Sequence, residues 1–351
     1  MPRRSIEVRG LENPVLAVDA MGGDAGSAVV VPAALTFLAN HPRVSLFLVG
    51  DREQIEPLLA SAGDESASRA EIVATSEVVG MDEAPADALR KKKDSSMRVA
   101  IDLVKAGRAQ ACISAGNTGA LMAISRFVLK TLPGIDRPAI ISGIPARHGH
   151  TLMLDLGANA DCSPEQLVQF AVMGTVIASE LHGIARPRVA LLNIGTEQNK
   201  GNEAIRLAGK MLARSELNYL GFVEGNDIMS GRVDVVVTDG FTGNVSLKTM
   251  EGLVRMLFQS IRDEVDKSWR QRLVAFAASP MLRSLQAKLD PRLYNGASLV
   301  GLQGIVIKSH GSADEIAFRN ALRTALIEIR KDAPGQIGAL MSRQKLLEDA
   351  V

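Results

Sequence analysis

The sequence predicts an α/β protein built on a three-layer, doubly wound and mostly parallel sheet. Short apolar runs alternate along the chain with longer segments of helical periodicity. The runs are apolar throughout instead of alternating with polar residues, which is typical of strands covered by helices on both faces. Most runs end in glycine accompanied by Asp, Asn, Thr or Ser, the residues that favour turns.

The first run shows the pattern that later runs repeat. Val15 to Val18 is apolar, Asp19 ends it, and Gly22 and Gly23 precede an apolar helical segment. We interpret this as a buried strand, a turn and a helix, whose free N–H groups can hold an anion. Strands are expected at 15–18, 44–49, 71–73, 111–114, 139–144, 151–156, 189–194, 220–223, 233–237 and 304–308. Helices are expected at 28–39, 54–62, 97–106, 121–131, 163–182, 203–213 and 316–331, a polar loop at 63–69 and irregular structure at 77–98.

Two helix starts carry capping signals. Ser163 stands three residues before Gln166, so it is the expected N-cap of a capping box. Ser312 and Glu315 have the same spacing ahead of 316–331, and Ser312 is the expected cap there.

The predicted domain organisation is simple. Residues 14–333 form one catalytic α/β domain, preceded by an extension at 1–13 and followed by a marginal tail at 334–351. Within the domain, 254–289 is expected to be a protruding amphipathic helical hairpin, because apolar residues follow helical spacing up to Trp269.

The hairpin is expected to end in an apolar tip. Leu273 to Leu282 carries no charge, arginines flank it, and Pro280 is expected to break the helix. Such a tip favours insertion into a membrane surface, but burial in a dimer interface explains the same residues nearly as well. The side chains expected to make this contact are Leu273, Val274, Phe276, Met281 and Leu282.

Composition argues against several classes of protein. Forty basic against thirty-nine acidic residues leave a net charge of +1, and only 3% of residues are aromatic, so no nucleic-acid partner is expected. Cys112 and Cys162 make no disulfide framework and suit a reducing cytosol. No apolar run reaches the roughly 20 residues that span a bilayer, and MPRRSIEVRGLEN lacks the apolar stretch of a secretory signal. The acidic residues show no clear metal-ligand spacing, so no metal is expected.

Seven predicted strand ends carry polar turns, and we expect all seven at one edge of the sheet, where parallel sheets bind ligands. Ordinary turn chemistry explains any one of them, but seven together less well. Backbone N–H groups at Gly22–Gly23, Gly116–Gly119 and Gly240–Gly243 are candidates for an anion cradle. Candidate side chains are Ser114, Asn117, Thr118, Thr242, Asn244, Lys200, Lys248 and Lys308.

Known catalytic signatures are missing. There is no GxxxxGK[ST] P-loop, no GxGxxG opening the chain and no GxSxG elbow. Cys112 lies in an apolar run and Cys162 has no adjacent histidine, so neither is expected to be a nucleophile. His310 follows a strand end and is the histidine best placed for acid–base work. The alternative acids are Asp155, Asp161, Asp239, Glu197 and Glu224.

Eight motifs together resemble the PlsX family of phosphate acyltransferases from bacterial phospholipid synthesis. They are VDAMGGD (18–24), RKKKDSSM (90–97), SAGNTGA (114–120), LDLGANAD (154–161), NIGTEQNKGNE (193–203), FVEGNDI (222–228), TDGFTGNV (238–245) and YNGASLVGL with IKSHGS (294–312). The resemblance implies a fold similar to isocitrate and isopropylmalate dehydrogenases and to phosphotransacetylase. It implies transfer of a long-chain acyl group from acyl carrier protein to inorganic phosphate. It also implies a cytoplasmic homodimer, peripheral to the membrane, that uses no cofactor and supplies acyl phosphate to a membrane glycerol-3-phosphate acyltransferase.

For such a transfer, the residues themselves suggest a division of chemical roles. Direct attack of phosphate on a thioester needs no enzyme nucleophile, which agrees with the missing signatures. On this hypothesis the glycine turns hold phosphate with Lys248 or Lys308, and His310 or an acid protonates the leaving thiol. The oxyanion donor is expected to be Asn159, Asn193 or Asn244. The acidic carrier is expected to bind either the basic run Arg90, Lys91, Lys92 and Lys93 or the arginines of the hairpin, although such a run is usually only a solvated surface.

Two rival functions are weighed against this one. A nicotinamide-dependent decarboxylating dehydrogenase shares the fold but needs an arginine cluster and metal-binding aspartates, which we cannot assemble from the sequence. A non-enzymatic scaffold that only recruits carrier protein to a membrane has no need for seven polar turns.

Overall fold

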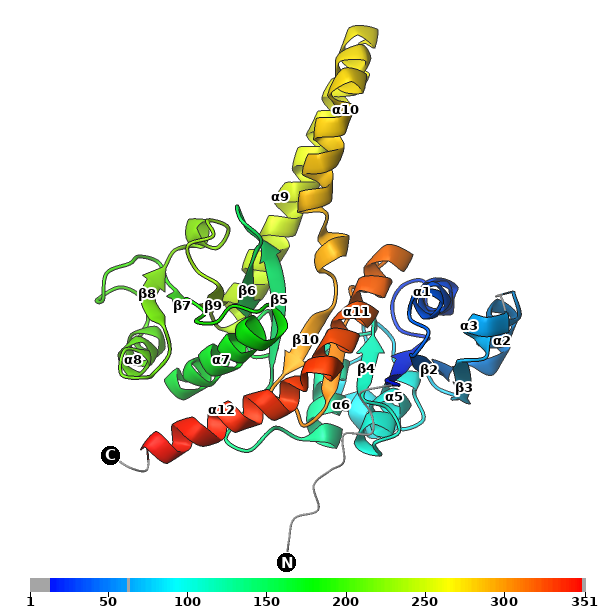
Figure 1. Cartoon of the computed structure of the whole chain (residues 1–351), viewed down its shortest axis with the longest axis horizontal. Coiled ribbons are helices and arrows are strands. Elements are labelled where there is room, and N and C mark those ends of the chain that lie inside the picture. Colours follow the sequence, from blue (N-terminus) through cyan, green and yellow to red (C-terminus); the bar gives the residue numbers. More distant parts are fainter. Residues whose placement is uncertain (1–12, 62–63, 349–351) are drawn as a thin grey trace, which may run out of the picture.

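The structure is a computed structural model that describes residues 13–61 and 64–348, so the expected extension at 1–13 lies almost wholly outside the described residues. A single sheet crosses the described part of the chain in the order β3-β2-β1-β4-β11-β10-β5-β6-β9-β7-β8, with helices on both faces (Figure 1). The expected α/β class is confirmed. The strands are β1 Val15–Asp19, β2 Ser45–Gly50, β3 Ala70–Ala74, β4 Ala111–Ser114, β5 Ala139–Pro145, β6 His150–Leu154, β7 Val189–Leu192, β8 Tyr219–Val223, β9 Val235–Val237, β10 Ala297–Val300 and β11 Ile305–Lys308.

Helices connect most of these strands. The α-helices are α1 Ser27–Asn40, α2 Arg52–Ala60, α3 Asp64–Ala67, α4 Pro85–Lys91, α5 Ser96–Lys105, α6 Thr118–Leu129, α7 Pro164–Val176, α8 Glu203–Leu212, α9 Gly240–Asp266, α10 Trp269–Leu289, α11 Glu315–Lys331 and α12 Ala333–Glu348. Short π- and 3₁₀-helical turns cover Ile177–Leu181, Gly225–Asp227 and Pro291–Tyr294.

The strands form two half-sheets that run in opposite directions. Strands β1, β2, β3, β4 and β11 are parallel to one another, and so are β6, β7, β8 and β9. Between them, the three pairings β11–β10, β10–β5 and β5–β6 are all antiparallel, which reverses the direction overall. The expectation that all seven polar turns leave one edge of the sheet is therefore wrong.

The polar turns of the two half-sheets nevertheless begin near one row of paired residues. One row of paired residues crosses the sheet through Val18, Ile113, Ile307, Ser298, Ile141, Leu154, Val237 and Leu191. Six of these residues are the last or next-to-last of their strands, three from each half-sheet. The half-sheets are thus staggered so that their carboxyl ends meet along the same row.

A common core layer joins the half-sheets. Alternate strand residues such as Ala17, Val306 and Met153 are buried together under α5, α6 and α9. The opposite face is divided into two clusters, one under α1 and α11 and the other under α7, α8 and α12. The two half-sheets therefore have one hydrophobic layer in common on this face, and α6 and α9, which begin at the strand ends, are part of it.

Several expected loops are regular structure. The loop 63–69 contains α3, and the segment 77–98 contains α4 and the start of α5. Strand β10 was not predicted, because a short run with a polar Ser298 between glycines does not stand out from a turn. The expected marginal tail from residue 334 is helix α12, which buries Ile337 against α7.

The capping box at Ser163 is confirmed, since its hydroxyl accepts the Gln166 N–H (3.3 Å) and the Gln166 side chain accepts the Ser163 N–H (3.0 Å). The cap of α11 was assigned to the wrong residue. Asp314, not Ser312, accepts the Ala317 N–H at 2.9 Å. A carboxylate next to the helix start displaces the more distant serine, and Ser312 contacts His310 instead.

The helical hairpin is present, but its turn is not where the sequence suggested. Helices α9 and α10 project from the body together (Figure 1), and α10 continues through Pro280. The chain reverses at Lys267 and Ser268, where the Ser268 hydroxyl caps α10 by accepting the Gln271 N–H at 3.3 Å. The uncharged segment is therefore the side of the return helix and not its tip.

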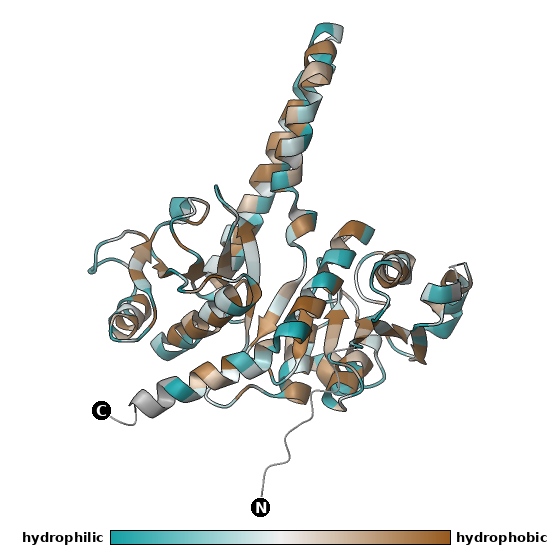
Figure 2. Cartoon of the chain, in the orientation of Figure 1, coloured by the Kyte–Doolittle hydropathy of each residue, from teal (hydrophilic) through white to brown (hydrophobic). Residues whose placement is uncertain are grey.

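The projecting part alternates apolar and polar residues along its length (Figure 2). Leu273, Val274, Phe276 and Met281 are exposed, Phe276 by 79%, and Leu282 is partly buried. No helix of the described chain is long and apolar enough to cross a bilayer.

Candidate active site

Three turns of the first half-sheet converge on one point. They follow β1 (Gly22 to Asp24), β4 (Ala115 and Gly116) and β11 (His310 and Gly311). The Asp24 N–H donates to the Gly311 carbonyl at 2.8 Å. A Cβ at Gly22 would lie 2.8 Å from the Gly116 nitrogen, and one at Gly23, where φ is +89°, would lie 2.9 Å from the Gly311 oxygen. Glycine is therefore required for the turns to approach one another.

A buried carboxylate holds these turns. Asp19, at the end of β1, accepts hydrogen bonds from the Ser96 and Ser114 hydroxyls, each at 2.6 Å. The Ser114 oxygen in turn accepts the Gly116 N–H at 3.0 Å. Burial raises the pKa of Asp19, and the two hydroxyls oppose that rise. Asp19 thus shapes the turns, and Ser96 was not among the predicted site residues because 77 positions separate it from Asp19.

Lys308, the last residue of β11, lies beneath the turns. Its ammonium donates to the Ala115 carbonyl at 3.2 Å and to the Ser309 carbonyl. Burial lowers the pKa of Lys308 to about 8; Asp19 opposes this effect and the nearby Lys248 adds to it. The site therefore contains a cation that titrates close to neutral pH.

His310 and Lys248 meet beside these turns. Lys248 comes from α9, and its ammonium is 3.5 Å from His310 Nε2. His310 Nδ1 faces the hydroxyl and the N–H of Ser312, at 2.8 and 3.2 Å, while Nε2 faces the Lys248 ammonium, which can only donate. Partial burial lowers the pKa of His310, and the positive charge of Lys248 lowers it further. At neutral pH the ring is therefore mainly uncharged.

The start of α6 offers further donors. The N–H groups of Thr118 and Gly119 precede the first helical hydrogen bond, and Thr118 is exposed. Asn117 is already engaged, because its Oδ1 accepts the Ala120 N–H and its amide donates to the Met81 and Glu83 carbonyls at 2.7 and 3.0 Å. Pro85 of α4 packs against Gly119, and a Cβ at position 119 would lie only 2.8 Å from the Pro85 side chain.

The second half-sheet builds a different cluster around Asp155. This buried carboxylate accepts the N–H groups of Ile140, Gly157, Ala158 and Asn159. The Asn159 side-chain amide donates to Asp155 and to the Pro138 carbonyl, both at 2.9 Å. Because both amide hydrogens are used, Asn159 has no donor left for an oxyanion.

The start of α9 packs against this cluster. The Gly240 N–H donates to the Asn159 carbonyl at 2.7 Å, and the Gly243 N–H donates to Asp239. Asp239 is the N-cap of α9, accepting the N–H and hydroxyl of Thr242 at 2.8 and 2.9 Å. These bonds argue against a phosphate cradle at Gly240–Gly243.

Asn244 connects the two clusters. A Cβ at Gly157 would lie 3.5 Å from its Cβ, and Asn244 is one helical turn before Lys248 on an exposed part of α9. Helix α9 therefore runs from the Asp155 cluster to His310.

Two predicted site residues lie elsewhere. Asn193 and Lys200 follow β7, five strands from β11, which corresponds to roughly 24 Å. The Asn193 amide donates to the Lys200 carbonyl at 3.3 Å, and its buried Oδ1 has no partner among the described residues. The structure does not bring them together with Lys308 and His310.

Neither cysteine is a ready nucleophile. Burial raises the pKa of Cys112 well above its usual range and that of Cys162 to about 12, so a thiolate is scarce at neutral pH. In the part of the chain that the structure describes, no three His, Cys, Asp or Glu side chains are grouped to hold a metal ion. The chemistry available is a set of cations and N–H donors grouped at the converging turns.

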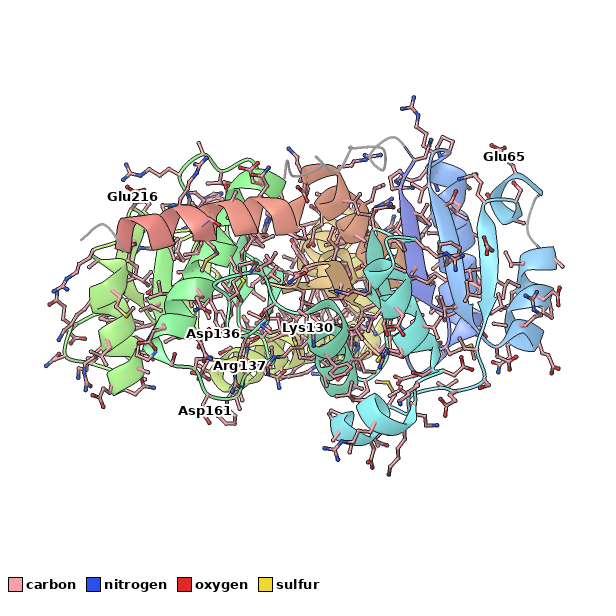
Figure 3. The ribbon with its side chains drawn as sticks, turned by 90° about the horizontal axis from the view of Figure 1, so that it is seen from below. Glu65, Lys130, Asp136, Arg137, Asp161 and Glu216 are labelled. Carbon is pink, nitrogen blue, oxygen red and sulfur yellow. The ribbon has the colours of Figure 1, made fainter. Side chains whose placement is uncertain are left out.

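The basic run lies on the surface next to this site. Arg90 and Lys91 end α4, and Lys92 and Lys93 follow it. All are at least partly exposed, and Lys91 pairs with Asp87 at 3.1 Å. In Figure 3, which views the molecule from below, another cation, Lys130, lies near the end of α6.

Solved structures share the fold. A phosphotransacetylase from Streptococcus pyogenes superposes with a TM-score of 0.59 at 19% identity, covering 90% of this chain and 96% of that one. A 4-hydroxythreonine-4-phosphate dehydrogenase from Salmonella typhimurium gives 0.51 at 11% identity, covering 90% and 99%. At such identities the likeness concerns the fold alone.

Sequence relatives are much closer. A family model described as fatty acid synthesis protein matches residues 15–334. Proteins named phosphate acyltransferase are 57% identical in Nitrosococcus oceani, over 92% of this chain and 95% of the relative, and 55% identical in Alkalilimnicola ehrlichii, over 93% and 95%. The chain therefore belongs to the fatty acid synthesis protein family, the PlsX family that its motifs resemble, and is an acyltransferase.

Proposed function

We propose that this protein transfers a long-chain acyl group from acyl carrier protein to inorganic phosphate, forming acyl phosphate and the free carrier thiol. The observation that carries the proposal is the convergence of three glycine turns above Lys308, beside Lys248 and His310. Such a site suits a small, doubly charged anion. The names of the close relatives support phosphate as the acceptor.

The reaction balances without an enzyme nucleophile. A phosphate oxygen attacks the thioester carbonyl carbon, a C–O bond forms and the C–S bond breaks. The proton of hydrogen phosphate ends on the departing sulfur, giving a neutral thiol. This direct route agrees with the high pKa of Cys162, and it relies on positioning and on charge stabilisation.

The geometry supports a division of roles. Lys308 and Lys248 hold the phosphate charge, together with the N–H groups of Gly23 and Thr118. His310 accepts the proton of hydrogen phosphate on Nε2 and passes it to the departing sulfur. Asn244, exposed on the same helix as Lys248, is the remaining candidate oxyanion donor.

Other predicted residues take supporting roles in this proposal. Asn117, Asn159, Asp239, Gly240 and Ser114 position the turns and helix starts through the bonds described above. Lys200 and Asn193 are too distant to share the same phosphate, and we assign them no step.

The direct test is to incubate the purified protein with acyl carrier protein bearing a thioester and with phosphate. Acyl phosphate, trapped with hydroxylamine, and free carrier thiol are expected in equal amounts and only when phosphate is present. Thiol release that does not depend on phosphate, or no release, contradicts the proposal. For His310→Ala we expect slower turnover and a changed pH profile, and an unchanged profile would remove His310 from the mechanism.

We also propose that the hairpin α9–α10 places the protein on the cytoplasmic face of the membrane as a homodimer, near a glycerol-3-phosphate acyltransferase that consumes acyl phosphate. The exposed side chains of α10 support an apolar contact. Leu273→Asp combined with Phe276→Asp is expected to abolish sedimentation with anionic vesicles. If vesicle binding persists while the dimer dissociates, these side chains belong to the subunit interface.

A further inference from the structure

Helices α4, α5 and α6 form a surface whose charge differs from that of the whole chain. Residues 85–130 contain nine Lys and Arg against three Asp, a net charge of +6, whereas the full chain carries +1. The three acids are already engaged. Asp87 pairs with Lys91, Asp102 with Arg98, and Asp94 accepts from Ser76. Arg108 pairs with Glu71, outside this segment, at 3.8 Å. Among the described residues, three of the nine cations thus have an acidic partner, and the other six are available to a binding partner.

One aromatic side chain stands among these cations. Phe127 is 54% exposed and is the only large apolar side chain that α4, α5 and α6 expose. The Arg98 guanidinium is 5.8 Å from the centre of its ring, and the Lys130 ammonium is 4.8 Å away. Both distances are within the range of cation–π contacts.

The cations around Phe127 are held in place. Arg98 is fixed by its bond to Asp102 at 2.9 Å. Lys130 has a positive φ of 64°, which is uncommon outside glycine, and Gln303 secures it by donating its N–H to the Lys130 carbonyl at 3.1 Å. An arrangement of this kind, an exposed aromatic with pre-positioned cations, has the composition of an interface hot spot.

Helix α6 links this surface to the candidate active site. Its first residue, Thr118, lies at the converging turns, and Phe127 is nine residues further on, or about 14 Å along the helix. Four-residue spacing places Gly119, Ala123 and Phe127 on one side of α6. Helix α4 packs against α6 at Gly119 and ends in the basic run.

We propose that the surface around Phe127, formed by α4, α5 and α6, is the docking site of the acidic carrier protein, whose prosthetic arm follows α6 to the turns at its N-terminus. This inference rests on the proposed function. Charge complementarity selects an acidic protein, and a single ring flanked by two cations suits a small apolar contact on that protein. A lipid surface would require a wider apolar area than one side chain provides.

The test compares two acyl donors, acyl carrier protein and acyl-pantetheine, which has the arm but no protein. Phe127→Ala and Lys130→Glu are each expected to raise KM for acyl carrier protein about tenfold, since a hot-spot side chain contributes above 1 kcal/mol. Turnover of acyl-pantetheine should be retained. Lys210→Glu, which makes the same charge change on the distant helix α8, should leave both donors unaffected.

The outcomes are distinguishable. If the unaltered protein makes acyl phosphate but KM for the carrier is the same in both variants, the docking site is wrong. It is equally wrong if both donors weaken together, or if the variants lose only binding to anionic vesicles. If the unaltered protein makes no acyl phosphate from either donor, the proposed function itself fails.

Discussion

Gly22→Ala tests whether the contact between the β1 and β4 turns is needed for phosphate binding. The added methyl group would lie 2.7 Å from Asp19 Oδ2 and 2.8 Å from the Gly116 nitrogen. Ordinary contacts begin near 3.4 Å, so the turns must separate by about 0.6 Å. Asp19 cannot move away easily, because Ser96 and Ser114 hold both of its oxygens inside the core.

The separation has two expected consequences. Overpacking of this kind destabilises a protein by about 1–3 kcal/mol. Misplacing the phosphate donors by a fraction of an ångström is expected to lower kcat/KM for phosphate by up to about 100-fold. The loss should appear mainly against phosphate concentration, because the displaced turns carry the phosphate donors.

The assay measures acyl phosphate formation at saturating thioester over a range of phosphate concentrations, with urea unfolding in parallel. Gly252→Ala is the matched control. It lies in α9 with nothing within 4 Å of the added Cβ, and it should keep wild-type kinetics. A Gly22→Ala protein with unchanged KM for phosphate and unchanged stability would refute the close-contact reasoning.

Three further predictions follow from the pKa values. Lys308, with a pKa of about 8, loses its charge as pH rises through 8, so KM for phosphate should rise there; Lys308→Arg stays charged and should remove that inflection in a pH series. Burial raises the pKa of Glu328 from 4.5 to about 7, and the Ser298 hydroxyl, which donates to Glu328 at 3.1 Å, opposes that rise. The folded state therefore loses stability as the pH rises from about 4.5 to about 7. Glu328→Gln should raise the free energy of unfolding, measured with urea, by roughly 3 kcal/mol at pH 8 and by little at pH 4. Cys162→Ser should keep turnover within about twofold, because the thiol is protonated; an acyl-enzyme trapped on Cys162 would contradict this.

Strand positions could be predicted from the sequence because strands buried on both faces appear as continuous apolar runs. Ala111–Ser114 was predicted to the residue, and most other strands to within two residues at either end. The Ser163 cap was equally readable, since a capping box lies within four consecutive residues. Strand β10 has no such apolar run, because it is short and contains the polar Ser298.

Most of the candidate site is formed by contacts between residues far apart in sequence, so the roles of its residues could not be predicted from the sequence. Asn117 and Asn159 look like free donors in their motifs, but their hydrogens are taken by Met81, Glu83, Asp155 and Pro138. Lys308 and His310 were grouped with the strand-end turns because they lie at the end of the same strand in sequence, whereas the approach of Lys248 depends on the path of α9.

The sequence by itself determined the α/β class, the strand–turn–helix units and the motifs that assign the family, because apolar periodicity and turn chemistry act over a few residues. Only the tertiary structure decided that the half-sheets oppose each other and that their ends share one row, because strand direction depends on pairings between distant segments. It also decided which polar side chains remain free, since a donor's partner is set by packing and not by its neighbours in the chain.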